Sequence, residues 1–153
     1  MHKKILLIFL FLVTTSCGYE SIYLDSGSSN FNITESEFVG DGEINKVIRE
    51  RLSKKKEESI ANKDYSIKII SQTTKEVRSK DAKGKPDLFK MVVEVKIIVN
   101  SKDIEKNYEK VFLGNSTYRN STNKFSLAEY EKIIKNNIAN RIVNSIKNYL
   151  NFL

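Results

Sequence analysis

Apolar residues alternate with polar ones along four stretches of the chain, the pattern of β-strands that bury one face. A first strand is predicted over residues 31–38, a second over 65–78 and a fourth over about 107–119. The third stretch, 89–99, alternates most strictly and is rich in β-branched residues, which favour strands. Its apolar positions are Phe89, Met91, Val93, Val95, Ile97 and Val99. We therefore expect four strands, each with one side turned to a core.

The spacing becomes helical in two places. Apolar residues three or four apart between 44 and 52 predict an amphipathic helix over about 43–57. A longer helix is predicted at the C-terminus from Ser126, because Ser126 and Glu129 have the spacing of a capping box. The apolar stripe of this helix is Leu127, Tyr130, Ile134, Ile138, Ile142, Ile146, Tyr149 and Leu153.

The predicted order is β-α-β-β-β-α. A meander with one apolar face and two helices with apolar stripes bury each other most simply as an α+β, two-layer sandwich. We expect a four-stranded, mostly antiparallel sheet packed by two helices, in a single domain over residues 31–153.

The N-terminus has the pattern of an export signal. Lys3 and Lys4 precede an unbroken apolar run over residues 5–13, which is too short for the roughly 20 residues of a spanning helix. Small residues and Cys17 follow, as in the lipobox of bacterial lipoproteins, although Thr14 stands where that motif usually has leucine. We expect residues 1–16 to be the signal and 17–30 to be a lipidated cysteine and flexible tether. The alternative is an ordinary signal peptide with a chance cysteine.

Composition and charge then limit the function. Loss of Lys3 and Lys4 leaves 24 of the 26 basic residues against 19 acidic ones, a net charge of +5. Such a chain could bind nucleic acid, anionic lipid or a phosphorylated glycolipid, and export to the envelope argues against nucleic acid. The mature chain has no histidine, and acylation removes its one thiol, so catalytic sites and zinc sites built on these residues are excluded. We expect no enzyme, cofactor or metal.

A basic connection links the second and third predicted strands. Its cations face only Glu76 and Asp81, and the excess of positive charge could bind phosphate or carboxylate groups. These cations are Lys75, Arg78, Lys80, Lys83 and Lys85. The alternative is a solvated hairpin tip. Lys90 and Lys96 alternate with the apolar face of the third strand and should emerge on the outer face of the sheet, for binding or for edge protection.

Asparagine recurs at every fourth position of the last predicted helix, at Asn136, Asn140, Asn144 and Asn148. The chain is rich in asparagine throughout, so compositional bias explains this ladder. A polar face at a protein–protein interface is the functional alternative.

Cys17, Gly18 and Tyr19 directly after the lipobox, on a short basic exported chain with the order β-α-β-β-β-α, resemble the LptE family of lipopolysaccharide-assembly lipoproteins. Gly18 also resembles the outer-membrane sorting pattern, since aspartate at that position is the usual signal for retention in the inner membrane.

The resemblance implies a lipid-anchored outer-membrane protein, facing the periplasm or inside a barrel lumen. It would plug the LptD β-barrel, assist assembly of that barrel and bind lipopolysaccharide during its insertion at the cell surface, without catalysis. The family's cations cannot be matched residue by residue here. Those expected to form the lipopolysaccharide-binding surface are Arg78, Lys80, Lys83, Lys85 and Lys90.

Two other functions fit parts of the pattern. An accessory lipoprotein of an envelope ABC transporter, or another small assembly factor, could share the tether and the charge. An envelope enzyme could use a pair of carboxylates on glycan, although the acidic residues fall mostly in predicted turns or beside lysines, as solvated surface does.

The lipid anchor can be tested by intact-mass spectrometry of the protein isolated from native membranes. We expect a chain that begins at Cys17 and carries acyl chains, each buried CH₂ of which adds roughly 0.8 kcal/mol of membrane affinity. Replacing Cys17 with alanine should abolish the added mass and the membrane retention. An unmodified Cys17 in the wild-type chain would contradict the anchor.

Overall fold

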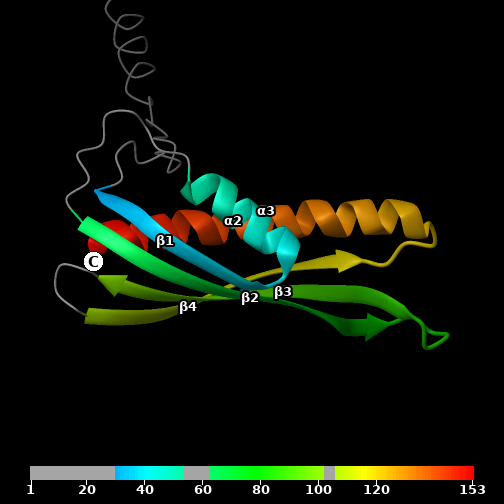
Figure 1. Cartoon of the computed structure of the whole chain (residues 1–153). Coiled ribbons are helices and arrows are strands. Elements are labelled where there is room, and N and C mark those ends of the chain that lie inside the picture. The colour runs from blue at the N-terminus through cyan, green and yellow to red at the C-terminus, as the bar shows by residue number, and fades with distance from the viewer. Residues whose placement is uncertain (1–29, 54–62, 102–105) are drawn as a thin grey trace, which may run out of the picture.

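The computed structural model describes residues 30–53, 63–101 and 106–153, and its elements follow the predicted order (Figure 1). The elements are β1 (Phe31–Gly40), α2 (Gly42–Leu52), β2 (Lys63–Lys80), β3 (Pro86–Ser101), β4 (Lys106–Arg119) and α3 (Lys124–Phe152). Neither described helix is long and apolar enough to cross a membrane.

The strands form one sheet in the order β1-β2-β3-β4. β1 runs parallel to β2, because the chain crosses over through α2 between them, and the other two pairs are antiparallel. Both helices lie on the same face of this sheet (Figure 1). The predicted α+β sandwich with a mostly antiparallel sheet is therefore confirmed. We call the side away from the helices the outer face.

The core lies between the sheet and the helices. In β3 the predicted alternation holds, since Val93, Val95, Ile97 and Val99 are fully buried while Glu94 is exposed. The helices contribute apolar side chains to the same cluster: Ile44 and Ile48 from α2, and Leu127, Ile134, Ile138, Ala139, Ile142, Val143, Ile146 and Leu150 from α3. Burial of these side chains joins the two layers, and each Leu, Ile or Val among them stabilises the fold by about 1.5–3 kcal/mol.

A glycine lets α3 approach β4 closely. A Cβ atom on Gly114 would collide with the methyl group Cγ2 of Ile138 and crowd the side chain of Ile142. Tight packing of this kind leaves no room for a methyl group unless the helix moves.

A polar junction connects both helices to the sheet around Asp41. Its carboxylate caps α2 by accepting from the backbone N–H groups of Glu43 (3.0 Å) and Ile44 (3.2 Å). The carboxylate also accepts from Thr73 Oγ1 on β2 (2.7 Å) and pairs with Lys135 Nζ on α3 (3.2 Å). Burial alone would raise the pKa of Asp41, but these hydrogen bonds and the lysine charge outweigh it and lower that pKa.

Two helix boundaries differ from the prediction. α3 begins at Lys124, two residues before Ser126, because Asn123 is its N-cap and accepts from the backbone N–H of Ser126 at 3.1 Å. The capping box at Ser126 was therefore wrong; asparagine caps a helix as well as serine does. α2 ends at Leu52 with Ser53 as its C-cap, and residues 54–57 of the predicted helix lie outside the described residues.

The close approach at Gly114 predicts a specific loss of stability. Replacing Gly114 with alanine should lower the free energy of unfolding by about 1–3 kcal/mol, the usual cost of overpacking. Gly42, in the first turn of α2, has open space around it. Its replacement by alanine should be neutral or stabilising by up to about 1 kcal/mol. Urea unfolding of both variants checks this, and equal stability of the two would show that α3 does not press on β4.

Candidate functional site

The basic connection is the tip of a long hairpin formed by β2 and β3. The last pairing between β3 and β4 joins Leu88 and Arg119, so the hairpin from Lys80 to Asp87 extends beyond the end of β4. In Figure 1 this green hairpin ends at the right of the molecule, past the yellow arrowhead of β4. Residues 74–80 of β2 are all exposed.

Asp81 organises the turn at the hairpin tip. Its carboxylate Oδ1 accepts from the backbone N–H of Lys83 (2.9 Å) and of Lys85 (2.8 Å). Its own N–H donates to the carbonyl of Lys85 (2.8 Å), and Gly84 supplies the positive φ of 77° that the turn requires. The only acidic residue of the turn is thus engaged with the backbone, beside two lysines.

Four predicted cations gather at this tip and are exposed: Arg78, Lys80, Lys83 and Lys85. We call them the basic tip. Arg78 sits at a β-bulge, because Val77 pairs with Phe89 and Ser79 with Leu88, which leaves Arg78 as the extra residue. Within the described ranges none of the four forms an ion pair.

Lys75 does not belong to the basic tip, although it lies in the same basic stretch of sequence. It faces the helices, where its Nζ pairs with Glu131 at 2.6 Å and lies 4.1 Å from the centroid of the Phe89 ring. Glu131 also accepts from the Tyr118 hydroxyl at 2.8 Å. Burial alone would raise the pKa of Glu131, but the bonds from Lys75 and Tyr118 outweigh it and lower that pKa. Lys75 therefore holds the hairpin against α3.

The sequence contains a sign that Lys75 faces the helices. Lys75 lies an even number of residues from the buried Ile67 and Ile69, so its side chain is on the same face of β2 as theirs.

Arg119 was missed by the sequence reasoning. It is exposed at the end of β4 opposite Leu88, in the row next to the basic tip. Nothing in the local sequence of β4 shows this neighbour, since the pairing with β3 creates it.

Lys90 and Lys96 do emerge on the outer face, but in different surroundings. Lys90 lies opposite Glu76 on β2 and Thr117 on β4, so an acidic neighbour offsets its charge. Lys96 forms an ion pair with Glu109 on β4. Because Glu76 offsets the charge of Lys90, Lys90 contributes less net positive charge to a phosphate-binding surface than a cation of the basic tip does. Cys17, the predicted lipidation site, lies outside the described residues.

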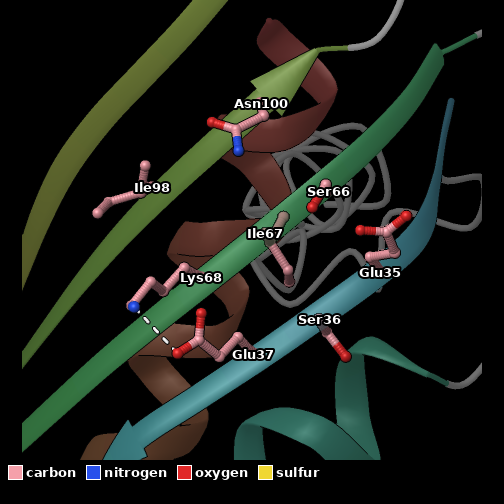
Figure 2. A pocket seen from close by; sticks show the side chains of 8 residues that line it. All are labelled: Glu35, Ser36, Glu37, Ser66, Ile67, Lys68, Ile98 and Asn100. Atoms are coloured by element: carbon pink, nitrogen blue, oxygen red, sulfur yellow. Dashed lines mark ion pairs between the residues drawn. The ribbon is translucent and has the colours of Figure 1, made fainter.

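A shallow hollow of about 310 Å³ lies on the outer face, across β1, β2 and β3 (Figure 2). An ion pair of 2.9 Å between Lys68 Nζ and Glu37 crosses it. Its lining side chains are Glu35, Ser36, Glu37, Ser66, Ile67, Lys68, Ile98 and Asn100. In the described part of the chain, no group of three His, Cys, Asp or Glu side chains is placed to hold a metal ion.

In sequence, the chain matches no protein-family model and no curated protein. Its structure is similar to that of rare lipoprotein B from Shewanella oneidensis, with a TM-score of 0.55 and 17% identity over 77% of this chain and 96% of that one. It is also similar to a lipoprotein from Caulobacter crescentus, with a TM-score of 0.51 and 12% identity over 83% and 92% of the two chains. This chain therefore has the fold of these two lipoproteins.

Proposed function

We propose that this chain is an outer-membrane lipoprotein of the LptE type. It would plug an LptD-type β-barrel, assist assembly of that barrel and help insert lipopolysaccharide at the cell surface. The observation that carries the proposal is the fold, shared with rare lipoprotein B over 77% of the chain. The lipobox around Cys17 supports it independently, because it predicts the same class of protein from residues that precede β1 in the sequence.

The basic tip gives the proposal its contact with lipopolysaccharide. Its cations are exposed, free of ion pairs among the described residues and carried by a hairpin that continues past the sheet. The phosphate groups of the glycolipid would accept charge-assisted hydrogen bonds from these side chains. Arg119 would add a further donor from the neighbouring strand. No step of this function requires catalysis.

Charge reversal at the basic tip should weaken lipopolysaccharide binding. In the triple variant Lys80→Glu, Lys83→Glu and Lys85→Glu, we expect an affinity about tenfold or more lower, since each contact turned into repulsion costs about 1 kcal/mol. Isothermal titration with purified lipopolysaccharide in detergent measures this.

The matched control reverses three lysines on the helices, Lys46, Lys132 and Lys147, with the same change in net charge. This control should retain most of the affinity, and both variants should bind dephosphorylated lipid A equally weakly. If both triple variants lost the same affinity for lipopolysaccharide, net charge alone would explain the loss, and the basic tip would not be the binding site.

The barrel partner is tested by purification from native membranes. The tagged chain should co-purify with a large outer-membrane β-barrel in near-equal amounts, identified by mass spectrometry. The triple basic-tip variant should retain the barrel, because the tip is assigned to glycolipid. Isolation of the chain as a monomer without a barrel, from membranes in which it is abundant, would contradict the plug function while leaving the lipid anchor intact.

A further inference from the structure

The free edge of β4 is uncharged over its central part. β4 ends the sheet and pairs only with β3 among the described strands. Its central part, Val111–Thr117, contains no charged residue and no proline, the devices that usually protect a sheet edge from other strands. The nearest lysine, Lys110, lies over the rings of Phe112 and Tyr149, at 5.5 Å and 4.6 Å from their centroids. The central part of β4 therefore lacks the residues that usually keep other strands from pairing with a sheet edge.

One side-chain contact shows which backbone groups point outward from this edge. Arg141 Nη2 on α3 donates to the backbone carbonyl of Asn115 at 3.3 Å. Because backbone direction alternates along a strand of an antiparallel pair, Val111, Leu113 and Thr117 turn their N–H and C=O groups the same way as Asn115. These residues turn their hydrogen-bonding groups away from β3, toward a side where no other described strand lies.

Apolar surface flanks the edge on both sides. On the outer face the side chains of Val111 and Leu113 are 46% and 66% exposed. On the helix side, Tyr130 and Ile133 of α3 are 51% and 54% exposed. They line a hollow of about 590 Å³ that reaches from Ser116 on β4 across α3 and includes Asn137, Arg141 and Asn144. An added strand would send alternate side chains into this hollow and onto Val111 and Leu113.

We propose that the free edge of β4 accepts an extended strand from a partner protein, with acidic side chains facing α3. The charged residues lining the hollow are Arg51 and Arg141, and no carboxylate lines it. A second copy of this chain supplies no such charge from its own β4, whose single acidic residue, Glu109, is paired with Lys96. This inference stands without the proposed function, because it uses none of the basic-tip residues.

The test uses the full mature lipoprotein in detergent and two nine-residue synthetic peptides of alternating valine and threonine. One peptide has two central threonines replaced by glutamate, and the other has them replaced by lysine. The glutamate peptide should bind more tightly and should slow amide hydrogen exchange at Val111, Leu113, Asn115 and Thr117. Absence of binding, or binding without protection of these amides, overturns the proposal.

Two variants separate strand pairing from general adhesion. Leu113→Pro removes one outward N–H at an edge position, where proline is tolerated, and should weaken binding of the glutamate peptide about tenfold or more. Leu113→Thr keeps the N–H and should lose less. Circular dichroism of each variant shows whether it is folded. Equal losses in folded Leu113→Pro and Leu113→Thr overturn strand pairing.

Arg141→Glu, at an exposed position of α3, tests the charge; it removes the hydrogen bond to the carbonyl of Asn115 but changes no residue of β4. Because Arg51 keeps its positive charge, the variant should lose the preference for the glutamate peptide and bind the two peptides with similar affinity. An unchanged preference overturns the acidic partner. Protection of the same amides that rises with protein concentration in the absence of peptide would assign the edge to a second copy and overturn the proposal as well.

Discussion

The packing of α3 across the sheet is the contact on which the rest of the structure depends. Ile138 and Ile142 of α3 reach β4 at Gly114, where the missing Cβ allows the two backbones to come close. Lys135, on the same helix, carries the charge that completes the Asp41 junction with α2 and β2. One helix therefore sets the position of the second helix and determines which side of the sheet becomes the outer face.

The packing of α3 also determines which cations are held in ion pairs within the fold and which are exposed to a ligand. Glu131, near the start of α3, forms an ion pair with Lys75, which lies 56 positions earlier in the chain. This pairing holds Lys75 against the helix, apart from the other cations of the basic stretch. The cations beyond the reach of α3 remain solvated, and the turn built on Asp81 holds two of them side by side. The proposed site for phosphate groups thus lies where the helix layer ends and the hairpin continues.

The course of α3 also explains the free edge of β4. The helix lies over Gly114 and the inner side of the sheet, so Tyr130 and Ile133 stay exposed on its flank. Two of the asparagines in the predicted polar ladder, Asn140 and Asn144, line the hollow beside this edge. The basic tip and the β4 edge share no residue, so the two proposed ligands, a glycolipid and a protein strand, would bind at separate surfaces.

Local pattern determined most of the architecture. Period-two alternation placed all four strands, and the apolar spacing placed both helices, because burial of one face demands that spacing whatever the partner is. The order of elements and the apolar surfaces then left a two-layer sandwich as the simplest packing. The pattern of an export signal before Cys17 was also read from the sequence alone, and it stays a prediction. The basic tip was also visible, since its lysines surround the turn residues themselves.

Only the tertiary structure decided what depended on residues distant in sequence. It joined Lys75 to Glu131, brought Arg119 beside the hairpin through the pairing of β4 with β3, and placed Glu76 opposite Lys90. It selected Asn123 over Ser126 as the cap of α3, a choice between two residues that cap helices about equally well. The reason is physical: periodicity reports which side of a strand or helix is buried, whereas charge pairing and free edges depend on which elements become neighbours.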